Sequence, residues 1–325
     1  MHKLNELDFS SATNELNEVL YDVKLISVAT STGESLFDGI YDNIKASNYK
    51  AVVNTKSKNI ICIVTNNYNL ITNQQALDMG KKAFKQLFPS IKTEELIPYK
   101  VISPKSKSYC FIDLIHKKVN FNVWEQETWL PFIRVINSYN RTYALTFELG
   151  FVRKVCSNGV IFDKKTIKVK YSHSEGIPID ISADVSKLKI LEADFINHLT
   201  NLKRFYIKPE HVFALLCKSL DLKFNFENKN NNPFLQKQIE KYENLKKLTA
   251  EKSKMYLKKD GDNVFAAFNV ITDIISNQNL YDNLPNYSIR ANGYYHKISN
   301  WMREFVELAE SRDFKMEKYL EDFLN

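Results

Sequence analysis

The sequence lacks the features that would direct the protein into or across a membrane. No stretch of its 325 residues is apolar for the length needed to cross a bilayer. The first 20 residues, MHKLNELDFSSATNELNEVL, contain no basic flank followed by an apolar core, which is the pattern of a secretory signal. We therefore expect a cytoplasmic protein with no membrane partner.

Cysteine is also rare, with four residues and no CxxC pair. Cys62, Cys110, Cys156 and Cys217 lie far apart, in apolar surroundings and without histidines at zinc-binding spacing. Isolated thiols of this kind behave as small buried hydrophobic side chains in a reducing compartment. We expect no disulfide, no metal and no cofactor.

No motif in the chain names a reaction, because neither GxxxxGKS/T nor GxGxxG occurs. Two catalytic alternatives stay open. Cys156 and His173 could act as nucleophile and base with Asp163 as the orienting acid, or Asp260 and Asp262 could hold magnesium in a nuclease. A turn at 156–159 and a helix-capping loop at 260–263 explain the same residues, so the sequence leaves open whether the protein is an enzyme.

The chain does contain enough apolar material for a large core, with 44% hydrophobic residues, 21 Phe and 17 Tyr. Short β-branched runs dominate up to about residue 178, and longer helical periodicity follows. This predicts an α+β fold whose antiparallel β-rich N-terminal two-thirds includes one capped helix and is followed by a helical C-terminal part. The expected division is a β-rich domain over 1–180 and a helical part over 181–325, with packing into one unit left open.

Local patterns give the expected elements of the front part. The motif Thr72-x-x-Gln75 is a capping box that begins a helix ending before Pro89, and we expect this helix to pack on the preceding hairpin. A helix is expected over 12–20, an extended segment over 23–30, a hairpin over 49–54 and 60–65, and a third strand over 68–71. Further strands are expected over 95–103, 109–116, 119–123, 132–136, 144–147, 160–162 and 166–171, with 109–116 and 119–123 forming a hairpin.

The back part shows the 3.6-residue period of helices. One stripe consists of Leu188, Leu191, Phe195, Leu199 and Leu202. Pro209 suits the first turn of a second helix, and a break at 260–263 separates two later ones. The later helices are expected over 233–258, 264–275 and 294–311.

Arginine is the scarce cation, with seven residues against 38 lysines, and three of the seven fall between Pro131 and Ser174. From Arg141 to His173 there are seven Arg and Lys residues and two acidic ones, which leaves an excess of +5. A guanidinium group matches the geometry of phosphate. We therefore interpret this stretch as the functional centre, an anion-binding strand surface, with an ordinary solvated sheet face as the alternative.

The residues predicted to bind nucleic acid are all basic. They are Arg134, Arg141, Arg153, Lys154, Lys168, Lys170, His173, Lys203 and Arg204. The segment from Lys203 to Lys208 combines cations with aromatic residues, which is typical of surfaces that bind single strands.

These patterns favour a nucleic-acid-binding protein that acts on single-stranded DNA, in an annealing or recombination-like role, as a monomer or a homo-oligomer. The alternatives are an enzyme, such as a nuclease or a nucleotide-modifying protein, and a protein that binds a host defence component.

Arg153 opens the segment RKVCSNG and has two possible roles. It could contact a phosphate, or it could form a bridge to a carboxylate such as Glu148 that fixes the following turn. The two roles differ in the effect of Arg153→Ala. Loss of a ligand contact weakens binding, whereas loss of a structural bridge lowers stability.

Several segments together resemble the phage/plasmid-like family of unknown function called DUF932. The segments are YKAVVN, IICIVTNNYNLITNQQAL, NSYNRTYALTFELGFVRKVCSNGVIF, KVKYSHS and NVFAAFNVITDII. The matching residues are Tyr68, Asn73, Arg153, Val155, Cys156, Asn158, His173, Phe265, Ala267, Asn269 and Thr272.

The chain departs from the family pattern at Asn140 and Arg141, where an aspartate and a glycine are usual, and at Phe265, where Trp is usual. The resemblance implies a context of phages and mobile elements and no particular reaction. The unit from Tyr49 to Phe88 also resembles the β-β-β-α core of single-strand annealing proteins, which is an analogy of fold alone.

Overall fold

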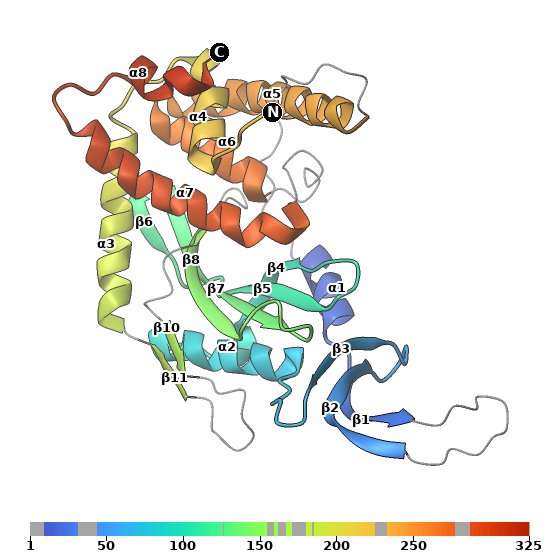
Figure 1. The fold of residues 1–325 in the computed structure, drawn as a ribbon. Helices are drawn as coiled ribbons and strands as arrows, with labels where there is room; N and C mark the ends of the chain where they lie inside the picture. Colours follow the sequence, from blue (N-terminus) through green and yellow to red (C-terminus); the bar gives the residue numbers. More distant parts are fainter. Residues whose placement is uncertain are drawn as a thin grey trace.

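The protein has the α+β architecture that the sequence predicts, with antiparallel sheets in the front part and mostly helices at the back. The computed structural model describes residues 10–31, 44–125, 127–154, 159–161, 167–170, 180–183, 185–224, 233–276 and 287–324. Figure 1 shows a central sheet with helices on both sides and a smaller sheet that projects from one end of the molecule.

The central sheet contains six antiparallel strands in the order β4-β5-β7-β8-β9, with β6 paired to β7 off this path. The strands are β4 (Ile97–Ile102), β5 (Tyr109–Ile115), β6 (Phe121–Trp124), β7 (Glu127–Ser138), β8 (Thr146–Arg153) and β9 (Gly159–Ile161). Every residue of β5 is buried, and so is every residue of β7 except Thr128. Burial on both faces explains why these strands read as apolar runs without alternation.

The expected hairpin between 109–116 and 119–123 is wrong. Strand β5 pairs with β4 on one side and β7 on the other, so both of its edges are occupied. Strand β6 instead forms a hairpin with β7, with Phe121 opposite Trp129. Local turn chemistry at Lys117-Lys118 could not reveal which distant strand would take the edge of β5.

Helix α2 (Asn73–Leu87) begins at the predicted capping box, in which Thr72 and Gln75 exchange side-chain-to-backbone hydrogen bonds. The helix packs on β7 of the central sheet, which corrects the expectation that it would cover the hairpin. The approach is close because a Cβ atom at Gly80 would lie 2.3 Å from Val135 Cγ2. A larger residue at position 80 would therefore push the helix off the sheet.

The helical part lies mainly on the other side of the central sheet (Figure 1). Its elements are α3 (Val185–Leu202), η2 (Pro209–His211), α4 (Val212–Leu220), α5 (Pro233–Asp260), α6 (Val264–Ser276), α7 (Tyr287–Ala309), α8 (Met316–Leu320) and η4 (Glu321–Phe323). The stripe of α3 faces inward as predicted, with Leu188, Phe195, Leu199 and Leu202 buried. Helices α6 and α7 contact β9, and α3 contacts β6.

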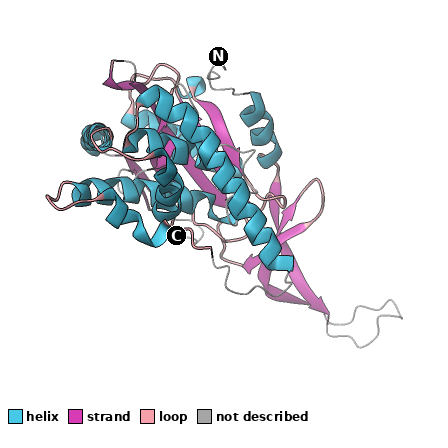
Figure 2. Ribbon diagram, turned by 90° about the horizontal axis from the view of Figure 1, so that it is seen from above, coloured by secondary structure: helices cyan, strands magenta, loops and turns pink. Residues whose placement is uncertain are grey.

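A second sheet, which we call the arm, consists of β1 (Val23–Ser31), β2 (Ile44–Asn54) and β3 (Ile60–Thr65) in the order β1-β2-β3. Figure 2 shows it extending away from the body of the protein. The expected strand over 68–71 is wrong, because those residues are coil, and β1 is the third strand.

Four shorter elements complete the described part of the fold. Helix α1 (Ser10–Val19) packs against β4, and the 3-10 turn η1 (Thr93–Glu95) precedes that strand. Strands β10 (Ile167–Lys170) and β11 (Asp180–Ala183) form a two-stranded sheet beside α2.

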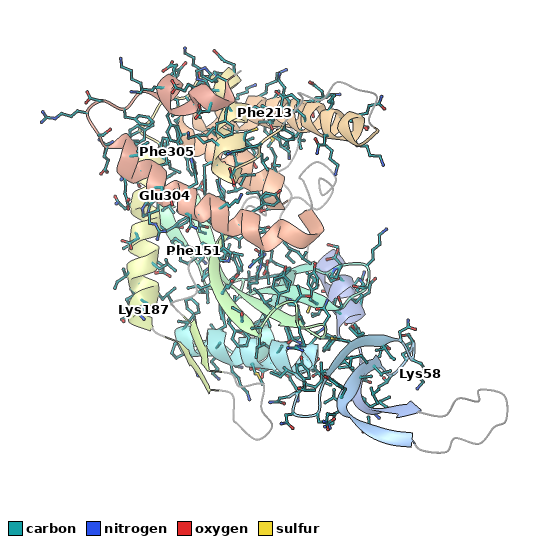
Figure 3. The ribbon with its side chains drawn as sticks, viewed as in Figure 1. Lys58, Phe151, Lys187, Phe213, Glu304 and Phe305 are labelled. Atoms are coloured by element: carbon teal, nitrogen blue, oxygen red, sulfur yellow. The ribbon has the colours of Figure 1, made fainter. Side chains whose placement is uncertain are left out.

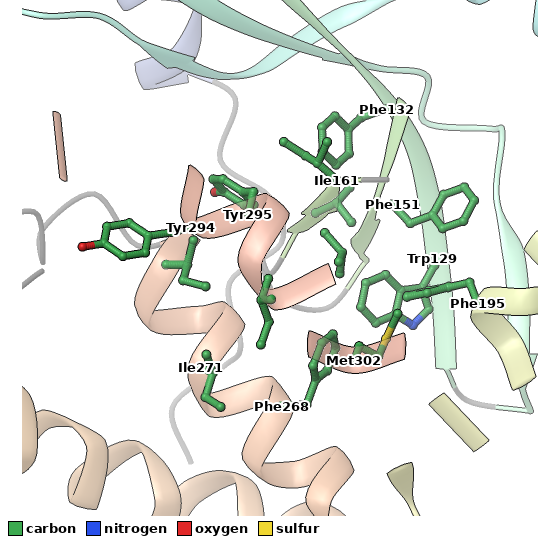
Figure 4. Packing of buried hydrophobic residues seen from close by; sticks show 14 of the residues in the cluster. Trp129, Phe132, Phe151, Ile161, Phe195, Phe268, Ile271, Tyr294, Tyr295 and Met302 are labelled. Atoms are coloured by element: carbon green, nitrogen blue, oxygen red, sulfur yellow. The ribbon is translucent and has the colours of Figure 1, made fainter. Parts of the chain in front are cut away.

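One contiguous cluster of buried apolar residues runs from the central sheet into the helical part. Figure 4 shows its middle, where Trp129, Phe132 and Phe151 of the sheet approach Phe195, Phe268 and Tyr295 of the helices. The aromatic contacts include Trp129 to Phe195, with ring centroids 4.9 Å apart. The core therefore crosses the expected division near residue 180.

The described cysteines carry free thiols. Cys110 and Cys217 are buried, and burial raises the pKa of each thiol to about 12, whereas Cys62 is half-buried. Cys156 lies outside the described residues. Among the helices of the described ranges, none is long and apolar enough to span a bilayer.

Candidate functional site

A row of three charged side chains crosses the central sheet. The strand register places Asp113 of β5 opposite Arg134 of β7, and Arg134 opposite Glu148 of β8. Arg134 donates two hydrogen bonds of 2.6 Å, from Nε to Asp113 Oδ1 and from Nη2 to Oδ2. All three side chains are buried, with Arg134 0% exposed. This geometry is a bidentate buried ion pair.

Helix α7 completes the surroundings of this row. Arg134 Nη1 donates to Asn292 Oδ1 at 2.9 Å, and Asn292 Nδ2 donates to Glu148 Oε2 at 3.2 Å. His296 Nε2 lies 3.1 Å from Glu148 Oε1. Burial alone would raise the pKa of the Glu148 carboxyl, but His296 and Arg134 outweigh it and hold the pKa below its ordinary value.

A second buried cation, Lys100 of β4, lies near the same row. Its Nζ donates to Tyr295 Oη at 2.6 Å and to the carbonyl oxygen of Ser276 at 2.7 Å. Ser276 Oγ accepts from the backbone N–H of Gly159 at 3.1 Å. Burial would raise the pKa of the Tyr295 phenol, but the charges of Lys100 and Arg134 outweigh burial and lower it.

We call these residues the charged core. It holds two cations, Lys100 and Arg134, and two carboxylates, Asp113 and Glu148, so its formal charges balance. It connects β4, β5, β7 and β8 with α6 and α7. Balanced, hydrogen-bonded charges of this kind fix one arrangement of the parts around them.

A signal for the charged core was present in the sequence. Each participating strand carries a charged residue within an apolar run: IPYKVI, YCFIDLI, FIRVI and TFELGF. Charges within buried strands need partners, so these positions could have been proposed to pair. Tyr294 and Tyr295 of α7 are both buried beside these strands.

Arg153 forms a separate buried ion pair at the end of β8. Its Nη2 donates to Glu127 Oε2 at 2.5 Å, and its Nε lies 2.5 Å from Oε1 of the same carboxylate. Trp129 Nε1 also donates to Glu127 Oε1, at 3.0 Å. Asp260 Oδ2 is 3.7 Å from Arg153 Nη1, and the guanidinium lies 5.5 Å from the ring centre of Phe265. Arg153 therefore forms the structural bridge, with Glu127 as its partner and not Glu148.

The prediction that Arg134 and Arg153 belong to one accessible anion-binding surface is wrong. Both are buried, Arg153 being 1% exposed. Because Arg153 is five residues from Glu148 along a regular strand, and Glu148 lies opposite Arg134, the two arginines point to opposite faces of the sheet. Each guanidinium already has a carboxylate partner in the protein.

Polar residues in the segments that resemble the family also form hydrogen bonds in the interior. Asn73 Nδ2 donates to the carbonyl of Val19, Asn137 Nδ2 donates to Asn73 Oδ1 at 2.8 Å, and Tyr139 Oη accepts from the backbone N–H of Asn73. These bonds join α1, α2 and the end of β7. Tyr68 is buried beside Tyr139. The motifs around Asn73 and Asn137 are thus connections between elements.

The other predicted binding residues lie apart. Arg141 is exposed in the loop after β7, with φ of 64°, whereas Lys154 is exposed at the opposite end of β8. Strand β8, about 24 Å from end to end, lies between these positions in the chain. Lys203 and Arg204 are exposed at the end of α3, with Lys203 Nζ 4.7 Å from the ring centre of Trp124.

Two more predicted residues, Lys168 and Lys170, lie on β10, which pairs with β11 and contacts β8, and His173 lies outside the described ranges. Asp260 turns towards Arg153 and Asp262 is exposed. Within the residues that the structure describes, no three His, Cys, Asp or Glu side chains gather in a way that could hold a metal ion.

The structure also reveals a surface that the sequence analysis missed, the outer face of the arm. Val23, Val52 and Val64 face inward and pack with Tyr68 and Tyr139. The alternate positions point outward, and there Ile26 is 52%, Tyr49 52%, Ile60 63% and Ile63 46% exposed. The register places Ile26 and Ile63 on either side of Ala51, two residues from Tyr49, so these side chains share one face.

The arm is rich in lysine and poor in acidic residues. The described parts of the arm and its turns, 20–31 and 44–70, contain Lys24, Lys45, Lys50, Lys56 and Lys58 against the single acid Asp22. Lys24 is exposed on the outer face, and Lys56 and Lys58 are exposed in the turn between β2 and β3. Figure 3 labels Lys58 on the arm.

Arg141 lies close to the base of the arm. Burial raises the pKa of the Tyr68 phenol, and the nearby charge of Arg141 partly opposes that shift. One predicted binding residue is therefore near the arm.

The family model described as Domain of unknown function (DUF932) matches residues 61–304. Because this match covers most of the chain, the protein belongs to the DUF932 family. No curated protein and no solved structure matches the chain. The matched range begins inside β3 and ends in α7, so it contains both buried arginine pairs and leaves β1 and β2 of the arm outside.

Proposed function

We propose that the protein binds single-stranded nucleic acid through the outer face of the arm and the neighbouring Arg141. The observation that carries this proposal is an exposed aromatic and aliphatic face on one projecting sheet, with Lys24 on that face and Lys56 and Lys58 in the adjoining turn. Lysines attract the phosphate backbone, and a tyrosine ring offers a stacking surface for a base of any sequence.

The buried arginines support the same choice by elimination. Arg134 and Arg153 are engaged with Asp113 and Glu127, and releasing either one would leave a buried carboxylate without its partner. On the arm, by contrast, Lys24, Lys56, Lys58 and Tyr49 are exposed. In this proposal the protein acts in the cytoplasm for a phage or mobile element, in an annealing or recombination-like step, alone or as a homo-oligomer.

The test is fluorescence anisotropy with a labelled oligo-dT of about 30 nucleotides, long enough for several binding sites. We expect Tyr49→Ala to weaken binding by about 5- to 100-fold, the equivalent of one lost stacking contact. The double variant Lys24→Gln/Lys58→Gln should reduce the slope of log K against log salt by about 1.4, because each single-strand phosphate contact contributes about 0.7.

The matched control is Lys247→Gln/Lys254→Gln, which removes the same charge from exposed positions of α5. We expect it to leave the salt slope unchanged. Equal losses in the arm and control variants would mean that binding follows net charge alone, which contradicts the proposal. If Tyr49→Ala and Ile63→Ser changed the oligomeric state but not oligonucleotide affinity, the outer face would instead be a protein interface.

A further inference from the structure

A pocket of about 550 Å³ lies between α4, the segment 221–224, α5 and η4. Its volume falls within the range of small-molecule sites. Four half-buried aromatic residues line it, Phe213, Phe224, Tyr242 and Phe323, together with Lys218 and Lys223. Figure 3 labels Phe213 in the helical part, at the far end of the molecule from Lys58 of the arm.

The aromatic rings form a connected wall. The ring centres of Phe213 and Tyr242 are 5.2 Å apart with an interplanar angle of 81°, and those of Phe224 and Tyr242 are 5.1 Å apart at 72°. Edge-to-face contacts hold each ring in place. A planar ligand that enters the pocket would therefore meet ring surfaces that are already ordered.

The ammonium group of Lys218 in the pocket is positioned by two aromatic rings. Lys218 Nζ lies 4.4 Å from the ring centre of Tyr319 and 5.6 Å from that of Phe323. Within the described residues no carboxylate forms an ion pair with Lys218 or Lys223. Rings attract an ammonium group but leave its hydrogen-bond donors unused.

The acidic residues at the pocket only partly neutralise its lysines, so a small positive net charge remains. Asp221 is engaged by Lys297, whose Nζ lies 3.3 Å from Asp221 Oδ2 and also donates to the carbonyl of Leu220. Asp322 is exposed at the rim. Counting Lys218, Lys223 and Lys297 against Asp221 and Asp322 gives 3 − 2 = +1. A ligand with one aromatic part and one anionic part fits this arrangement.

We propose that this pocket binds a nucleoside monophosphate, with the base against Phe213, Phe224 and Tyr242 and the phosphate at Lys218 and Lys223. Asp322 can accept a hydrogen bond from a ribose hydroxyl or a base amino group. The pocket acts as a binding site. Cys217 contributes to its wall, but burial raises the pKa of that thiol to about 12, so the reactive thiolate is scarce near neutral pH.

The test is a calorimetric titration of the full chain with AMP, adenosine and inorganic phosphate. We expect AMP to bind saturably with a dissociation constant below 1 mM, and adenosine about tenfold more weakly, because a charge-assisted hydrogen bond is lost without the phosphate. Lys218→Gln should weaken AMP about tenfold and leave adenosine unchanged. Phosphate alone should not bind measurably.

Lys247→Gln, an exposed lysine of α5 outside the pocket lining, is the matched control and should bind AMP like the wild type. Tyr242→Phe keeps the ring and should retain binding, whereas Tyr242→Ala should lose it while keeping its far-ultraviolet circular dichroism. No saturable binding of AMP, GMP, CMP or UMP at millimolar concentration would overturn the proposal, as would AMP binding that is indifferent to Lys218→Gln. Both outcomes are independent of the arm, because the titrations contain no oligonucleotide.

Discussion

Replacing Arg134 by alanine should lower the free energy of unfolding by about 3 to 5 kcal/mol, since it removes one partner of a buried ion pair. The variant leaves Asp113 without its two hydrogen bonds and Glu148 without the charge opposite it, and both carboxylates are buried. Chemical denaturation measures the loss. Arg134→Lys keeps the charge but cannot form the bidentate pair of hydrogen bonds with Asp113. We therefore expect an intermediate loss of unfolding free energy.

Two further variants distinguish the contribution of the ion pair to stability from that of side-chain packing. Arg303→Ala removes an exposed arginine from α7 and should change stability by less than about 0.5 kcal/mol. Arg134→Met/Asp113→Leu replaces both charges by apolar groups and should recover much of the loss of Arg134→Ala. A loss below about 1 kcal/mol for Arg134→Ala would contradict the charged core as described here.

The second large effect is expected for Arg153→Ala, again about 3 to 5 kcal/mol of unfolding free energy. Glu127 would keep its bond from Trp129 Nε1 but lose both contacts with the guanidinium group. Asp260 would lose its nearby cation as well. Chemical denaturation again measures stability, and anisotropy at several salt concentrations measures oligonucleotide binding.

The combination of the two measurements identifies the role of Arg153. A structural bridge lowers stability and leaves the salt slope of binding unaltered below the unfolding transition. A ligand contact leaves stability nearly unchanged and reduces the salt slope by about 0.7. Glu127→Gln provides the reciprocal check, because it keeps the shape of the partner and should also destabilise the protein through the buried guanidinium. Unchanged stability in both variants would contradict the bridge.

The parts of the fold that could be predicted from sequence are those determined locally. The capping box of Thr72 and Gln75 marked the start of α2, and the apolar stripe from Leu188 to Leu202 marked α3. Both signals depend on residues within one or a few helical turns. The break at Gly261, with φ of 89°, followed from its glycine in the same way.

The errors concern contacts between residues distant in sequence. The clustering of arginines along the strands indicated an exposed surface, yet the acids that neutralise Arg134 and Arg153 lie 21 and 26 residues earlier in the chain. Their positions became neighbours only through the register of β5, β7 and β8. The pairing of β6 with β7 was hidden for the same reason, since a turn sequence does not specify which strand occupies an edge.

The candidate site itself could be predicted only in part. Arg141, Lys154, Lys203 and Arg204 are exposed as a binding role requires, but they lie on separate parts of the molecule. The outer face of the arm has an apolar composition, which in sequence is indistinguishable from a buried strand. Only the structure shows that Val52 points inward and Tyr49 outward.

Amide hydrogen exchange with and without saturating oligo-dT tests the central claim, that the arm contacts the nucleic acid, most directly. We predict slower exchange over residues 49–65, in β2, β3 and their turn, with little change in β7 and β8, whose amides are buried in the central sheet. Protection confined to the end of α3 or to β10, with the arm unchanged, would contradict the account, as would an absence of binding at low salt.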